Sequence, residues 1–180
     1  MRRLALMLVG ISLAVLLASG VALAVTRFGT PGDDTIRGTN GPDQIVGRAG
    51  DDDIFSLGGR DTLYGGKGRD RLVGGPESES GLLRSSGDKV MLGGPGDDIL
   101  LGGKGTDTLA GSSGDDFLAD GPFFREFQRD VLAGGAGTDE LSAFNSPASR
   151  DTVGCGTGRD TAEVDRKDIV GDDCERVLLF

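Results

Sequence analysis

The chain has 180 residues, the length of a single domain, and its formal net charge of −10 argues against nucleic acid and favours cations as ligands. Glycine is abundant at 33 residues, whereas aromatic residues are few (8 Phe, 1 Tyr, no Trp), so a conventional hydrophobic core would be thin.

The first predicted element is an apolar leader at residues 1–24, which we expect to be helical. Met1–Arg3 is basic, the following run is apolar, and Ala22-Leu23-Ala24 has the small-x-small pattern of a cleavage site. This pattern predicts a secretory signal peptide. The alternative is an uncleaved membrane anchor, because about 20 apolar residues span a bilayer. Both alternatives place the rest of the chain outside, since the basic N-terminus favours the cytoplasmic side.

A nine-residue repeat runs without interruption from Gly29 to Val73. Cut at nine, it reads GTPGDDTIR, GTNGPDQIV, GRAGDDDIF, SLGGRDTLY and GGKGRDRLV. Position four is always glycine, position six is always aspartate, and position eight is always aliphatic. A fixed short period of this kind is the signature of a solenoid.

Each unit has room for one turn and one short strand. The Gly- and Asp-rich positions one to six favour a turn, because glycine adopts positive φ without strain. Positions seven to nine favour a strand, in which neighbouring side chains alternate between faces. Position seven is polar at Thr35, Gln44 and Asp53, so position eight should point inward. Two units per coil would form two narrow parallel sheets that face each other across an aliphatic ladder.

Stacking also brings the position-six aspartates together. Coils about 4.8 Å apart would line up carboxylates in a column along each edge, where like charges repel. A hard cation removes this repulsion, and Ca2+ accepts carboxylate and carbonyl oxygens in a more tolerant geometry than Mg2+ does. With two units per coil, Asp34, Asp52 and Asp70 should share one column, and Asp43 with Asp61 the other.

The unit resembles the G-G-x-G-x-D-x-U-x nonapeptide of the RTX, or haemolysin-type, calcium-binding repeat proteins. The best matches are GGKGRDRLV at 65–73, GGPGDDILL at 93–101, GGKGTDTLA at 102–110 and GGAGTDELS at 134–142. The resemblance implies an all-β fold, a right-handed parallel β-roll, with several Ca2+ ions held between turns of neighbouring coils. The departures are mostly at position two, where glycine is replaced at Thr30, Thr39, Arg48 and Leu57.

Calcium ligands are therefore expected at positions four and six of each unit. The expected glycines are Gly32, Gly41, Gly50, Gly59, Gly68, Gly96, Gly105, Gly114 and Gly137. The expected aspartates are Asp34, Asp43, Asp52, Asp61, Asp70, Asp98, Asp107, Asp116 and Asp139. No catalytic residue is expected among them.

The phase of the repeat breaks after residue 76. Residues 77–86 are rich in Ser and Glu and predict a loop that bulges from the stack. The pattern resumes with Met91 in the aliphatic place, but Lys89 stands where aspartate is expected. Lysine cannot ligate calcium, so we expect an empty or altered site there. Its ammonium would either neutralise the column as an internal cation or lie exposed in a decayed repeat.

Three regular units follow, up to residue 119, and then a second insertion at 121–128 interrupts the phase. This insertion contains Phe123, Phe124 and Phe127. Such an aromatic cluster predicts either a local plug that packs over the stack or a partner surface.

The repeat domain should span residues 25–154, with a C-terminal cap at 155–180 that covers the last hydrophobic rung. Fragments of the pattern persist to Asp160 within this cap. Cys155 and Cys174 are the only cysteines. In a chain that leaves the cytosol, such a pair predicts a disulfide.

The absence of histidine excludes Ser-His-Asp and Cys-His catalysis and His-ligated zinc. Paired acids such as Asp51-Asp52 recur at turn positions, where calcium explains them more simply than glycoside hydrolysis does. We expect an extracellular calcium-binding protein whose β-roll folds on binding Ca2+, with a structural or interaction role and no enzymatic activity. A surface adhesin that uses the Phe123, Phe124 and Phe127 insertion is the alternative, and an enzyme with a site in an insertion is a third. A membrane partner is expected only if the leader is uncleaved.

Overall fold

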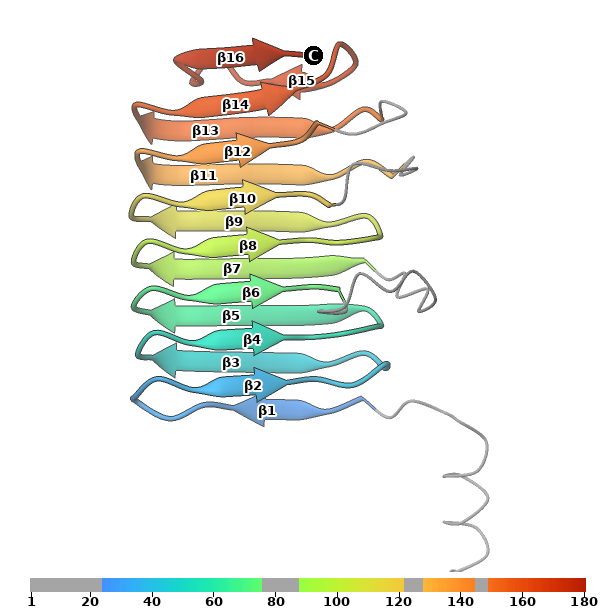
Figure 1. Cartoon of the computed structure of the whole chain (residues 1–180), viewed down its shortest axis with the longest axis vertical. Coiled ribbons are helices and arrows are strands. Elements are labelled where there is room, and N and C mark those ends of the chain that lie inside the picture. Colours follow the sequence, from blue (N-terminus) through green and yellow to red (C-terminus); the bar gives the residue numbers. More distant parts are fainter. Residues whose placement is uncertain (1–23, 76–87, 122–127, 145–148) are drawn as a thin grey trace, which may run out of the picture.

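The computed structural model of the chain describes residues 24–75, 88–121, 128–144 and 149–180. Nearly all of the leader expected at 1–24, and of the insertions expected at 77–86 and 121–128, lies outside these residues, including Phe123, Phe124 and Phe127. Within the described ranges the chain forms two stacked layers of short strands, and the strands of one layer run opposite to those of the other (Figure 1). Over the same ranges, no helix is long and apolar enough to cross a membrane.

The strands of the described residues form two eight-stranded sheets. The first sheet contains β1 (Thr26–Phe28), β3 (Gln44–Ala49), β5 (Asp61–Lys67), β7 (Lys89–Pro95), β9 (Thr108–Ser113), β11 (Val131–Gly137), β13 (Thr152–Gly158) and β15 (Ile169–Val170). The second contains β2 (Thr35–Arg37), β4 (Asp53–Phe55), β6 (Arg71–Val73), β8 (Ile99–Leu101), β10 (Phe117–Ala119), β12 (Glu140–Ser142), β14 (Thr161–Val164) and β16 (Arg176–Leu179).

Each coil contributes one strand to each sheet, and neighbouring strands within a sheet are parallel. In the second sheet, Ile36 of β2 pairs with Ile54 of β4, which pairs with Leu72 of β6. In the first sheet, Ile45 of β3 pairs with Leu63 of β5. The step between paired residues is therefore two units of the repeat. The arrangement confirms the all-β parallel β-solenoid and the two-unit coil predicted from the sequence.

The core is the stacked position-eight ladder, which lies between the two sheets. Its members are Ile36, Ile45, Ile54, Leu63, Leu72, Met91, Leu100, Leu109, Leu118, Leu132, Leu141, Val153 and Ala162, all buried. The position-seven side chains of Thr35, Gln44 and Arg71 are exposed. Because a strand alternates its faces, this core confirms the inward direction predicted for position eight.

Residues 155–180 continue the stack. β14 pairs in parallel with β12, with Ala162 opposite Leu141, and β16 pairs with β14. Cys155 of β13 and Cys174, which lies between β15 and β16, form the predicted disulfide, with their Cα atoms 5.0 Å apart. This crosslink ties the last coil to the one beneath it.

Candidate metal centres

The aspartates that precede the strands of the second sheet form a continuous column, which we call the first column. Its members are Asp34, Asp52, Asp70, Asp98, Asp116, Asp139 and Asp160. From Asp34 to Asp139, the backbone N–H of each donates to Oδ1 of the aspartate one coil further along, at 2.9 Å from Asp34 to Asp52 and 2.7 Å from Asp70 to Asp98. The predicted pairing of Asp34, Asp52 and Asp70 in one column is thus present in the structure.

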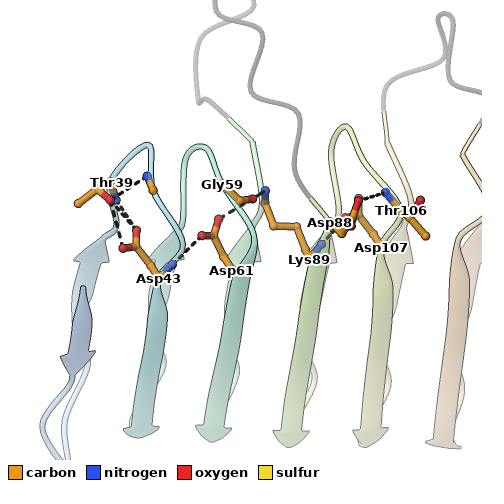
Figure 2. Close-up of polar contacts among 9 residues, drawn as sticks. Thr39, Asp43, Gly59, Asp61, Asp88, Lys89, Thr106 and Asp107 are labelled. Atoms are coloured by element: carbon orange, nitrogen blue, oxygen red, sulfur yellow. Dashed lines mark hydrogen bonds and ion pairs between the residues drawn. The ribbon is translucent and has the colours of Figure 1, made fainter. Parts of the chain in front are cut away.

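The second column runs along the other edge, before the strands of the first sheet. Its members are Asp43, Asp61, Lys89, Asp107, Asp130, Asp151 and Asp168. The same hydrogen bond recurs, from the Asp43 N–H to Asp61 Oδ1 at 2.9 Å and from the Lys89 N–H to Asp107 Oδ1 at 2.7 Å. Figure 2 shows these residues at the same end of neighbouring strands. Asp107 lies opposite Asp98 and Asp116, as the two-unit coil predicts.

The second carboxylate oxygen of most first-column aspartates has no hydrogen-bond partner among the described residues. This buried Oδ2 atom belongs to Asp52, Asp70, Asp98, Asp116, Asp139 and Asp160. A buried polar atom without a partner costs roughly 1–3 kcal/mol, and more when it is charged. A metal ion that accepts electron pairs from these oxygens would remove this cost.

Backbone carbonyls lie around the same oxygens. A Cβ atom placed on Gly47, at position one, would collide with Asp52 Oδ2 and with the carbonyl oxygen of Gly65, one coil further along. In the same way, a Cβ atom on Gly65 would collide with Asp70 Oδ2 and with the carbonyl oxygen of Gly93. Carboxylate and carbonyl oxygens thus surround a space that is open only because position one is glycine. Oxygen ligands of these two kinds are what Ca2+ prefers.

Position-two conformation decides whether this space is open. In the units of Asp52, Asp70, Asp98, Asp116, Asp139 and Asp160, the position-two residue has positive φ, from 95° at Arg48 to 130° at Gly66. In the first two units, Thr30 and Thr39 are not among the positive-φ residues, and their N–H groups donate to Oδ2 of Asp34 and Asp43. Asp34 and Asp43 therefore lie in the columns as predicted, but the Oδ2 atom of each already accepts a hydrogen bond from its own turn.

The position-four glycines stack backbone on backbone. Gly50, Gly59, Gly68, Gly96, Gly105, Gly114 and Gly137 all have positive φ. A Cβ atom on Gly68 would collide with the carbonyl oxygen of Gly50, and one on Gly96 with that of Gly68. Gly32 and Gly41, in the first units, are not among the positive-φ residues. The glycine requirement at position four is therefore conformational from Gly50 onward, and at glycines such as Gly68 and Gly96 it is also steric.

Burial raises the pKa of three carboxyls in the middle of the first column, and neighbouring carboxylates raise it further. The pKa is raised to about 6 at Asp70, about 7 at Asp98 and about 6 at Asp116, in each case mainly by desolvation and against a backbone hydrogen bond that lowers it. Without a cation these groups keep their protons up to a higher pH than an ordinary aspartate does. A divalent ion beside them would reverse this effect, because an opposite charge favours the carboxylate.

A cluster of buried carboxylates, formed by two members of the second column and one aspartate beside it, was not predicted from the sequence. Asp120, Asp130 and Asp151 each offer an oxygen within 4.8 Å of the others. Desolvation, followed by the charges of the neighbouring aspartates, raises the pKa of Asp130 to about 8. Asp120 stands at position one, where most units have glycine. Its sequence signal is weak, because the insertion at 121–128 follows it directly.

A second ladder of position-five residues was also missed. The Asp51 N–H donates to Asp33 Oδ1 at 2.8 Å, and the Arg69 N–H to Asp51 Oδ1 at 2.9 Å. The Asp115 N–H donates to Asp97 Oδ1 at 3.0 Å in the second block. These carboxylates are exposed, unlike those of the columns. The signal available in the sequence was the Asp-Asp pair, which recurs at the coil period of 18 residues.

The comparison with protein families identifies this architecture. A family model of the RTX calcium-binding nonapeptide repeat matches in four copies, at residues 28–63, 54–77, 85–118 and 128–143. The chain belongs to this family. A comparison with curated proteins gives no match. RTX nonapeptide repeats bind Ca2+, so this chain is a calcium-binding β-roll protein with several calcium-binding repeats, and Ca2+ is its cofactor.

Proposed function

We propose that this chain is an extracellular protein whose β-roll folds on binding Ca2+ and then serves as a structural or interaction module rather than an enzyme. The coils bring acidic side chains together at both edges of the stack. In the absence of metal, repulsion within the columns opposes this compaction. Calcium binding would supply the missing free energy, because ligands that converge only in the folded chain couple binding to folding.

The observation that carries this proposal is the row of buried Oδ2 atoms in the first column that have no hydrogen-bond partner within the described ranges. All of these atoms belong to units whose position-two residue has positive φ. Those of Asp52, Asp70, Asp98, Asp116 and Asp139 lie beside backbone carbonyls of the next coil. We infer that Asp52, Asp70, Asp98, Asp116 and Asp139 ligate calcium together with backbone carbonyls of the turns. The Asp34 and Asp43 carboxylates, which accept hydrogen bonds from their own turns, would bind more weakly or not at all.

Two features support an extracellular location. The leader has the composition of a signal peptide, and Cys155 and Cys174 form a disulfide, which persists in oxidising compartments. Proteins with these repeats are typically secreted. Extracellular modules bind calcium with dissociation constants of about 10⁻⁴–10⁻³ M. We propose that residues 1–24 direct export, residues 25–154 bind calcium and residues 155–180 close the stack.

A calcium titration followed by far-ultraviolet circular dichroism tests the proposal. We expect a weak β signal in excess chelator and a cooperative rise of that signal, with a fall in hydrodynamic radius, as calcium is added. Magnesium at the same concentration is the control, and it should produce a smaller change because it demands near-octahedral coordination. An equally β-rich and compact protein in chelator would contradict folding on binding.

A further inference from the structure

Lys89 occupies the place of an aspartate in the second column, and its side chain is fully buried. It is 1 % exposed and is the largest of the fully buried side chains in the described part of the chain. The Lys89 N–H makes the same bond to the next coil as the aspartates do, to Asp107 Oδ1. The exposed lysine of a decayed repeat, one of the two alternatives left open by the sequence, is therefore wrong.

The Lys89 ammonium contacts the two kinds of oxygen that the repeat offers to a metal ion. Nζ lies 2.6 Å from the carbonyl oxygen of Gly59, which is at position four, and 3.4 Å from Asp61 Oδ2, which is at position six (Figure 2). Asp61 Oδ1 accepts the Asp43 N–H, so Oδ2 is the oxygen of this carboxylate that faces the next coil. In sequence, Gly59 lies 30 residues before Lys89, whereas the regular coil step is 18 residues. The longer separation arises because the insertion at 77–86 intervenes.

The electrostatics of this position favour one cation and not two. The side chains of Lys89 and Asp61 are both 0 % exposed, so their charges interact with little solvent screening. A buried ammonium is tolerated only when it is paired and hydrogen-bonded, and Asp61 and Gly59 provide the pair and the bond. A Ca2+ ion bound to the same two oxygens would lie against this ammonium and be repelled by it.

We propose that the Lys89 ammonium is a resident cation that replaces one calcium ion, between the coil of Asp61 and the coil of Lys89. The proposal rests on the proposed calcium-binding function of the remaining units. It places a metal-independent contact where the repeats before the insertion at 77–86 meet those after it. Paired residues there are 28 positions apart in sequence instead of 18. One step of the second column therefore stays neutralised when calcium is removed.

Counting bound calcium ions by native mass spectrometry of the intact protein tests this replacement. Lys89→Asp restores the carboxylate column beside Gly59 and Asp61, and we expect this variant to bind one calcium ion more than the wild type. Lys104→Asp is the matched control, because it makes the same charge change at an exposed position-three turn residue. Its calcium count should equal that of the wild type. An unchanged count in folded Lys89→Asp, or an equal gain in Lys104→Asp, would overturn the proposal.

Amine labelling of the wild-type protein provides a second readout that needs no variant. In the calcium-loaded protein, an acetylating reagent should modify Lys104 and Lys67, which are exposed, while Lys89 stays unmodified. Labelling of Lys89 at the rate of Lys104 would overturn the buried cation, even if Lys89→Asp fails to fold. A wild-type protein that binds no calcium would instead overturn the proposed function, and the labelling result alone would then decide the placement of Lys89.

Discussion

Adjacent residues of one unit have opposite environments. Asp52, at position six, is 2 % exposed and accepts the Asp34 N–H through Oδ1, and its buried Oδ2 has no hydrogen-bond partner in the described part of the chain. Asp53, at position seven, is half exposed and lies 3.9 Å from an Arg71 guanidinium nitrogen across the sheet. Exposed ion pairs of this kind contribute about 0–1 kcal/mol. The two carboxylates therefore have separate roles despite their adjacency.

The contrast between Asp52 and Asp53 leads to a first prediction. Asp52→Ala should weaken calcium binding by at least about tenfold, the loss that even outer-shell partners of a metal cause, and should lower the melting temperature in calcium. Asp53→Ala should change stability by no more than about 0.5 kcal/mol, as surface substitutions usually do. Calcium titration midpoints and melting temperatures of both variants check this. Equal losses in the two variants would show that the repeat phase is displaced by one residue.

The residue roles that follow from the phase alone could be predicted, and those that depend on distant neighbours could not. Position eight points inward because a strand alternates its faces, which is a local property of the unit. The burial of Lys89 depends on Gly59, a residue 30 positions earlier whose carbonyl receives the ammonium. The closure of the first turns by Thr30 and Thr39 likewise depends on backbone conformation. Sequence letters alone do not fix these choices.

At the scale of the strands, stability comes from repeated contacts between identical positions of successive coils. Ile54 of β4 is fully buried and pairs with Ile36 of β2 on one side and Leu72 of β6 on the other. β4 is only three residues long, and Ile54 is the one side chain that it contributes to the core cluster. A short strand of this kind is stable only as part of the stack.

The second prediction concerns this ladder. Ile54→Ala should destabilise the calcium-loaded protein by roughly 2–5 kcal/mol, the usual cost of truncating a fully buried aliphatic side chain. The calcium ligands stay in place, so the number of calcium ions bound by the folded variant should be unchanged. Thermal unfolding in excess calcium, combined with calcium counting, checks both points. A variant of wild-type stability would contradict the buried ladder.

The contacts between coils also explain why the nine-residue pattern is hard to follow in the C-terminal coils. Asp160 continues the first column, and its N–H donates to Glu175 Oε2 at 2.8 Å, so a glutamate takes the aspartate's place in the last coil. The longer side chain and the changed spacing of 15 residues hide this unit from a nine-residue pattern. By contrast, the two columns and the two sheets follow from the phase because every regular unit repeats the same geometry.

For the whole molecule, burial of many carboxyls couples folding to pH. Desolvation raises the pKa to about 6 at Asp70, about 7 at Asp98 and about 8 at Asp130. An unfolded aspartate has a pKa of about 3.9. The metal-free folded chain therefore binds more protons than the unfolded chain between roughly pH 4 and 8, and its stability falls as pH rises through this window.

The third prediction follows from this sign. In chelator, the protein should have more β structure and a higher melting temperature at pH 5 than at pH 8. Calcium affinity should have the opposite pH dependence. It should fall as the pH is lowered, because the ion has to displace protons from the carboxyls. Circular dichroism and thermal melts at both pH values, with and without calcium, check this. Greater metal-free stability at pH 8 would contradict the buried, uncompensated columns.

The central claim is that calcium lies between position-six aspartates one coil apart, and a crystal structure of the calcium-loaded protein with anomalous scattering tests it most directly. We predict ions along the first column between Asp52, Asp70, Asp98 and Asp116, with carboxylate and carbonyl oxygens at about 2.3–2.6 Å. No ion should lie between Asp61 and Lys89. Ions bound at the position-seven side chains, or columns without calcium at saturating concentration, would contradict the account.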